Sequence, residues 1–294
     1  MFDFRHSIDS EVLTSSNSNR LLLTAALPGG PYWGQNYLVN ETINYVDWMN
    51  IMAYNVLGTW GGITDCSSPL QNPQNMNGDS IMKAVSYFLS QSAQSSMYNN
   101  QPQPSKFNLG MSLWGISYKL ISSQLNGVGA PAYNGSNGIL ATPGWCTKQP
   151  GYLAYFEIKP IIQNTTVSIQ VNQDPIGLCN YFVYNGDQLS IDTLKFHFIR
   201  CSYRKENDYL LSSHVFLTIF YAFSFSFLFI YFFIFILFYF FHFRWVGYDD
   251  SNSFSKKIEW MKTMNLGGIS IWGIDADIPN TWELNHSINQ NLIS

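Results

Sequence analysis

The sequence has little charge, and its charged residues are scattered. Only 12% of the 294 residues are Asp, Glu, Lys or Arg, the formal net charge is −4, and no cluster of Lys and Arg with interleaved aromatics occurs. We therefore expect no nucleic-acid partner. The four cysteines form neither a CxxC pair nor a Cys/His ligand pattern, so we expect no zinc site. No cofactor or other metal site is predicted.

A signal peptide is also missing from the first residues. MFDFRHSIDSEV lacks the basic and apolar regions that such a peptide needs. Asn-x-Ser/Thr sequons are nevertheless compatible with a secreted glycoprotein, and they begin at Asn40, Asn134, Asn164 and Asn285. The sequence thus predicts either a protein that stays inside the cell or a secreted protein whose true start is missing.

Aromatic residues reach 17% of the chain, and much of the excess falls in one apolar block, residues 215–241, which contains no charge. As a helix this block would span about 40 Å, enough to cross a bilayer as a single-pass anchor. The other interpretation is that 189–244 is a retained intron, because T-rich DNA encodes Phe, Ile, Tyr and Leu. Removing residues 189–244 joins Gln188 to Trp245 and gives VYNGDQWVGYDD, the sequence of an unbroken strand pair. Both interpretations stay open.

Four short apolar blocks are typical of strands in a parallel sheet; they cover 21–27, 48–54, 107–113 and 268–272. The first is stopped by Pro28-Gly29-Gly30 and predicts a strand buried on both faces. Helices are predicted within 80–98, with Ser80 as N-cap, and from Lys256 to Met264. This alternation predicts right-handed parallel units, four strands of a (β/α)8 TIM barrel, with a site at their carboxyl ends.

In chain order, these blocks resemble the last four barrel strands of family 18 glycoside hydrolases, the chitinase family. The strand matches are LLLTAALPG (21–29) for the fifth, VDWMNIMAYNVLGTW (46–60) for the sixth, KFNLGMSLWG (106–115) for the seventh and LGGISIWGIDAD (266–277) for the eighth. GYLAYFEI (151–158) and WVGYDD (245–250) match a small α+β insertion domain between strands 7 and 8. The resemblance implies a partial barrel over 1–114, the insertion over 115–188, the apolar segment at 189–244, and the end of the insertion with strand 8 over 245–294.

The resemblance also implies a secreted protein whose groove binds chitin or chito-oligosaccharides. The candidate binding residues are Met52, Tyr54, Asn55, Trp114, Trp272, Trp33 and Trp60. Tyr54 would hydrogen-bond the acetamido group, and Trp272 would form an apolar floor under a sugar ring. Trp33 and Trp60 would stack on flanking sugars. The alternative for any one aromatic is a place in the core.

Catalysis in that family needs a glutamic acid that protonates the leaving oxygen while the substrate's own N-acetyl carbonyl attacks. The acid belongs to an Asp-x-x-Asp-x-Asp-x-Glu run on the fourth strand, and these 294 residues contain no such run. Asn55 stands where the pattern has Asp, and Ile116 where it has Arg. Asp249, Asp250, Asp275 and Asp277 are expected to be solvated loop carboxylates.

No catalytic residue is therefore predicted, and whether the protein is an enzyme stays open. One function is that of a chitinase-like hydrolase fragment, inactive as it stands. The other is a non-catalytic, lectin-like chitin-binding protein, which the membrane interpretation of 215–241 would anchor to a bilayer.

Overall fold

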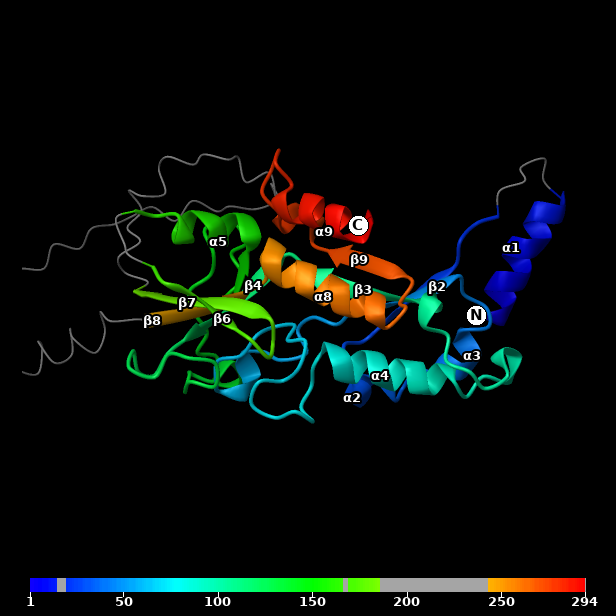
Figure 1. The fold of residues 1–294 in the computed structure, drawn as a ribbon, viewed down its shortest axis with the longest axis horizontal. Helices are drawn as coiled ribbons and strands as arrows, with labels where there is room; N and C mark the ends of the chain where they lie inside the picture. The colour runs from blue at the N-terminus through cyan, green and yellow to red at the C-terminus, as the bar shows by residue number, and fades with distance from the viewer. Residues whose placement is uncertain (15–19, 166–168, 186–242, 294) are drawn as a thin grey trace, which may run out of the picture.

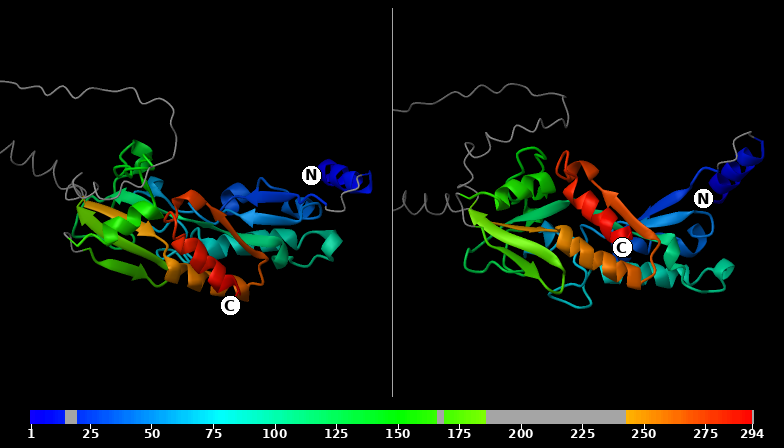
Figure 2. Two further views of the ribbon diagram at one scale, coloured as in Figure 1. Left: turned by 90° about the horizontal axis from the view of Figure 1, so that it is seen from above. Right: turned by 45° about the horizontal axis from the view of Figure 1, so that its top comes forward.

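The computed structural model describes residues 1–14, 20–165, 169–185 and 243–293. The apolar block 215–241, with both of its interpretations, lies outside these residues. Two sheets follow one another along the long axis, and helix α1 lies at the end away from the antiparallel one (Figures 1 and 2). The helices are α1 (Phe2–Thr14), α2 (Pro31–Gly34), α3 (Val39–Thr42), α4 (Ile81–Ser92), α5 (Tyr155–Ile162), α8 (Ser251–Thr263) and α9 (Glu283–Ile293).

The first sheet is parallel and has the predicted strand order. It consists of β1 (Thr24–Leu27), β2 (Trp48–Ile51), β3 (Phe107–Ser112) and β9 (Gly268–Trp272), hydrogen-bonded in the order β1-β2-β3-β9. Among the described residues it does not close into a barrel. The prediction for 21–27 is partly wrong, because Leu21 and Leu22 precede the strand and are 61% exposed. Residues 24–27 alternate between more exposed and more buried side chains, because helices cover only one face of the sheet.

One face of the parallel sheet packs against α4, α8 and α9. The shared core includes Leu27, Met49, Ile51, Phe107, Leu109, Phe88, Ile258 and Leu284. Ser80 caps α4 as predicted, since its hydroxyl accepts a hydrogen bond from Lys83 N at 3.3 Å. This apolar face fixes the register of the strands, because a shift by one residue would turn the core side chains outward.

The opposite face of the sheet is small and polar. Side chains alternate along a strand, so Asn50, Asn108 and Ser270 lie on the side away from the core. Asn108 Nδ2 donates to Asn50 Oδ1 at 3.1 Å. Thr24 and Ala26 of the edge strand are exposed on this side. This face lies open in the described structure, but it is not a second apolar core.

The second sheet is antiparallel and lies between β3 and β9 in the chain, where the family resemblance implies a small α+β insertion domain. Its strands are β4 (Trp114–Lys119), β5 (Tyr152–Ala154), β6 (Val171–Asp174), β7 (Cys179–Asn185) and β8 (Phe243–Tyr248), in the order β5-β4-β8-β7-β6. Because β3 runs into β4 through Leu113, this sheet stands at the carboxyl end of the parallel one (Figure 1). Ile116 is a buried residue of this sheet and pairs with Tyr152 and Gly247.

Strand β8 pairs with β7 along the whole of its own length. The register runs from Asn180 opposite Tyr248 to Asn185 opposite Phe243. The two ends of segment 186–242 therefore start and finish at the same end of one strand pair. Within the described ranges, no helix has the length and apolarity to cross a bilayer.

The acids that follow β8 and β9 were expected to be solvated loop carboxylates. That expectation is wrong for two of them, which are buried. Asp249 is 9% exposed and accepts from Lys257 Nζ at 2.6 Å, while Asp277 is fully buried. Asp277 accepts from the backbone N–H groups of Leu284 and Asn285 at the start of α9. Asp250 is the N-cap of α8, Asp275 is exposed, and α8 begins at Ser251 rather than at 256. Asp250 and Asp277 are structural because helix starts need acceptors for their free N–H groups, and Asp249 is structural because it pairs with the buried Lys257.

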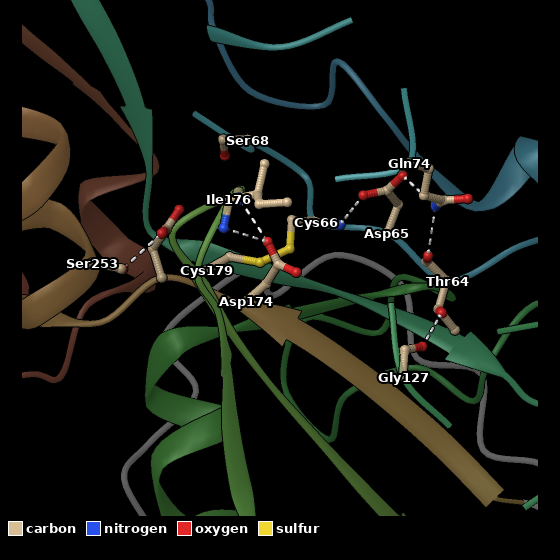
Figure 3. The surroundings of a disulfide bond; sticks show 12 residues. Thr64, Asp65, Cys66, Ser68, Gln74, Gly127, Asp174, Ile176, Cys179 and Ser253 are labelled. Atoms are coloured by element: carbon tan, nitrogen blue, oxygen red, sulfur yellow. Dashed lines mark hydrogen bonds between the residues drawn. A yellow bond between two sulfur atoms is a disulfide. The ribbon is translucent and has the colours of Figure 1, made fainter. Parts of the chain in front are cut away.

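A disulfide joins the two sheets. Cys66, in the loop after β2, is bonded to Cys179 at the start of β7, with the two Cα atoms 6.3 Å apart (Figure 3). Both cysteines are buried, and the adjacent Asp65 accepts from Cys66 N at 2.8 Å and from Gln74 Nε2 at 3.0 Å. The loop that follows β2 is thus tied to the antiparallel sheet.

Candidate functional site

Tyr54 and Trp114 form an aromatic pair at the carboxyl end of the parallel sheet. Tyr54 follows β2, Trp114 opens β4, and their ring centroids lie 5.5 Å apart in an edge-to-face contact. Trp114 Nε1 donates to Asn55 Oδ1 at 3.3 Å. Three of the predicted site residues are therefore in direct contact.

Two glycines make room for this pair. A Cβ added at Gly110 would lie 3.1 Å from Tyr54 Cε1 and 2.3 Å from Ile51 O, and one at Gly273 would lie 2.9 Å from Trp114 Cζ3. Gly273 also has φ of +76°, which other residues adopt only with strain. Because Gly273 follows Trp272, the backbone of the β9 end packs directly on the Trp114 ring.

Trp272 presents its ring to solvent at the end of β9. The residue is 63% exposed and is the register partner of Ser112, the last residue of β3. An exposed indole beside polar groups suits stacking on the C–H face of a sugar. The alternative that this aromatic residue belongs to the core is therefore wrong for Trp272.

Trp60 and Trp33 are exposed on separate short helical turns. Trp60 is 50% exposed, and its ring lies against Gly58, since a Cβ at that glycine would be 2.1 Å from Trp60 Cζ3. Trp33, on α2, is 64% exposed and meets Tyr32 edge to face at 5.0 Å. Among the described residues, no ring contact joins either tryptophan to Tyr54 or Trp114. Each remains a surface platform outside the contact cluster.

Met52 and Tyr54 supply the remaining predicted groups. Met52 is half-buried, and its backbone N–H donates to Leu27 O at 2.8 Å, which fixes the chain between β2 and Tyr54. Burial raises the pKa of the Tyr54 hydroxyl. This phenol is therefore protonated at neutral pH and can donate a hydrogen bond to a ligand.

The buried carboxyl groups of the described structure are held by structural contacts. Glu157 is 1% exposed and accepts four hydrogen bonds, from two residues of the 146–147 loop and from Ala154 N at the start of α5. Asp249 and Asp277 hold α8 and α9. Burial raises the pKa of Asp65 to about 6, but this group faces the disulfide loop. None of these four acids contacts Tyr54 or Trp114.

Ser67 belongs to the contact cluster of Tyr54, Asn55 and Trp114, and the sequence analysis missed it. Its hydroxyl donates to Asn55 Oδ1 at 2.9 Å and accepts from Asn55 N at 3.1 Å. Nothing in the run Cys66-Ser67-Ser68 marks this serine, because the contact depends on how the loop returns to the end of β2. Gly273 was detectable, since a glycine directly after an exposed strand-end tryptophan indicates close packing.

Comparisons with known proteins point to one family. A sequence profile of glycosyl hydrolases family 18 matches residues 3–214. Human chitinase-3-like protein 2 is 26% identical over 269 residues, which is 90% of this chain and 50% of that protein. Mouse chitotriosidase-1 is 28% identical over 269 residues, 91% of this chain and 42% of that protein. The chain thus spans about half the length of the curated relatives it matches.

A solved structure shows the same fold. Human YKL-39, described as a pseudo-chitinase with retained chitooligosaccharide binding properties, superposes with a TM-score of 0.66 at 22% identity. The match covers 100% of this chain and 63% of that one. The profile and the superposition agree with the resemblance read from the strand blocks.

Proposed function

The chain belongs to glycosyl hydrolases family 18, and we propose that it carries the groove-forming strands of a chitinase-like protein that binds chito-oligosaccharides without cleaving them. The observation that carries this proposal is the contact cluster of Tyr54, Asn55 and Trp114 beside the exposed Trp272. An aromatic platform beside neutral hydrogen-bonding groups is what an uncharged oligosaccharide needs.

The parallel sheet corresponds, in this proposal, to strands 5 to 8 of an eight-stranded barrel. Residues 1–114 carry the first three, 115–188 form most of the insertion domain, and 245–294 complete the insertion and add strand 8. The parallel order β1-β2-β3-β9 and the antiparallel sheet inserted before β9 support this division. The small, polar open face would then line the barrel interior.

Each groove residue has a role suited to an N-acetylglucosamine polymer. Tyr54 donates its hydroxyl to the acetamido oxygen, and Trp272 forms the floor under the ring. Met52 lines the apolar side of the same position. Trp33 and Trp60 extend the surface for flanking sugars.

Cleavage is not expected from these residues. The Asp-x-x-Asp-x-Asp-x-Glu run is absent from the 294 residues, and the buried acids are committed to helix starts and loops. Without a general acid, the rate loses a factor of about 10² to 10⁴. The related hydrolase function, breakdown of β-1,4-linked N-acetylglucosamine polymers, then requires an acid from outside this sequence. Asn55, which stands where the family has a carboxylate, favours the binding function.

An extracellular location agrees with the Cys66–Cys179 disulfide, because such bonds persist in oxidising compartments. A single membrane crossing by 215–241 does not agree with the β7–β8 register. Asn185 and Phe243 pair across one strand end, so both ends of the segment lie on the same side of any bilayer. We therefore favour the retained-intron interpretation of 189–244.

Binding is tested by calorimetric titration of the full chain with tetra-N-acetylchitotetraose. The wild-type chain should bind saturably, and Trp272→Ala should abolish binding because the sugar loses its floor. Trp282→Ala is the matched control, since Trp282 is another exposed tryptophan, at 40%. Unaltered affinity in Trp272→Ala, or equal losses in both variants, contradicts the assigned groove.

A further inference from the structure

The sequon Asn134-Gly135-Ser136 lies on a surface turn between β4 and β5. Asn134 begins a short 3₁₀ turn, and its Oδ1 accepts from Ser136 N at 2.8 Å. The nitrogen Nδ2 has no hydrogen-bond partner among the described residues and is not sealed from solvent. Ser136 is exposed, and a Cβ added at Gly138 would meet no atom within 4 Å. The turn therefore uses the amide oxygen and leaves the nitrogen available beside open space.

The helical turn that carries Trp60 borders this sequon on two sides. A Cβ added at Gly135 would lie 2.7 Å from Thr59 Oγ1. A Cβ at Gly62 would lie 3.8 Å from Asn134 Cβ and 3.9 Å from Asn134 Nδ2. Trp60 stands between Thr59 and Gly62 in the chain and is 50% exposed. A group attached to Asn134 Nδ2 thus begins next to the segment that presents this indole to solvent.

The sequon at Asn285 offers its nitrogen less freely. Asn285 Nδ2 donates to Asp277 Oδ2 at 2.7 Å, and Asp277 is fully buried where it caps α9. A sugar on that nitrogen would begin against the acceptor that holds the start of the helix. Asn134 has no such commitment, because its nitrogen takes no part in the turn.

We propose that Asn134 is an N-glycosylation site and that the first N-acetylglucosamine of its oligosaccharide packs on Trp60. The inference goes beyond the proposed function and needs only the extracellular route given there. The transfer forms a bond between Nδ2 and the sugar C1 while the bond from C1 to the pyrophosphate of a lipid-linked oligosaccharide breaks. The amide loses one proton and keeps the other, and Oδ1 remains the acceptor of the turn.

Trp60 suits this role because its ring is held in place but not covered. The ring lies so close to Gly58 that a Cβ at that glycine would collide with it. The apolar C–H face of a pyranose can cover such an indole and remove its surface from water. A sugar that is covalently attached nearby has a high effective concentration, so it occupies Trp60 ahead of a free ligand. In the glycosylated chain, flanking sugars of a ligand are then left to Trp33.

The modification is tested by peptide mass spectrometry on the full chain, directed into the secretory pathway of eukaryotic cells by a cleavable leader. The wild-type chain should carry an oligosaccharide at Asn134, and peptide N-glycosidase should release it and convert the asparagine to aspartate. Ser136→Ala should remove the oligosaccharide, whereas Ser136→Thr should keep it, because a hydroxyl two residues after the asparagine completes the sequon. An unmodified Asn134 in wild-type chain from which the leader has been cleaved overturns the site.

The contact with Trp60 is tested by hydroxyl-radical labelling of the wild-type chain and the Ser136→Ala variant. Trp60 should be labelled several-fold less in the glycosylated chain, while Trp272, which is 63% exposed, should be labelled equally in both. Equal labelling of Trp60 in the two proteins overturns the contact. Neither measurement involves a free ligand, so a failure of the proposed function appears separately, as absent binding in the titration with tetra-N-acetylchitotetraose.

Discussion

Replacing both Cys66 and Cys179 with alanine should cost this protein much of its stability. The disulfide joins residues separated by 113 positions and closes a loop that leaves out segment 186–242. For a loop of that length, the loss of chain entropy in the unfolded state is worth about 5 kcal/mol. With an unfolding entropy of roughly 2.1 cal/mol/K per residue over 294 residues, this corresponds to a fall in Tm of about 8 °C.

The measurement is thermal unfolding followed by circular dichroism, on the double variant and the wild-type chain in identical buffer. Cys66→Ala alone should give the same loss, because it breaks the same bond, and thiol labelling should then detect Cys179. A double variant that melts within about 2 °C of the wild type refutes the reasoning. It would mean that the unfolded chain is already restrained, or that the tie between the sheets is dispensable.

Three further outcomes follow from the structure. Burial raises the pKa of Asp65 from 3.8 to about 6, so the folded state binds this proton more tightly and loses stability as pH rises through that window. Asp65→Asn should therefore raise the unfolding free energy by about 3 kcal/mol at pH 8 and by much less at pH 4, measured with urea; equal effects at both pH values contradict this. Gly273→Ala should destabilise by about 1–3 kcal/mol and alter the near-ultraviolet signal of Trp114, through its φ of +76° and its 2.9 Å contact; a melting curve identical to wild type contradicts the packing. Deleting 189–244 should leave a folded chain with a short β7–β8 hairpin, and an unfolded deletion variant contradicts the retained-intron interpretation. Sequenced cDNA should also lack the codons for 189–244.

The strand order could be predicted because it follows from local patterns. Each parallel strand is a short apolar block, and the family-like motifs appear in their usual sequence. Cores of parallel sheets select such blocks strongly. The start of the first strand was misplaced at Leu21 because the full apolar run was read as strand, whereas helices cover only one face of β1.

Tertiary contacts made the rest unpredictable. Ser67 reaches Asn55 only because the loop after β2 folds back, and no spacing rule encodes that return. Four cysteines allow three pairings, so the partner of Cys66 could not be deduced. Asp277 reads as a loop acid until the start of α9 is known, and then its burial follows from the need to cap that helix.

Native mass spectrometry of the full chain with tetra-N-acetylchitotetraose tests the central claim most directly, because one spectrum reports both binding and cleavage. Our account predicts an equimolar complex with the intact tetramer, unchanged after prolonged incubation. Free chain without complex contradicts the groove at Tyr54, Trp114 and Trp272. Complexes with shorter oligomers, or their accumulation in solution, would show that an acid within these 294 residues cleaves the bond.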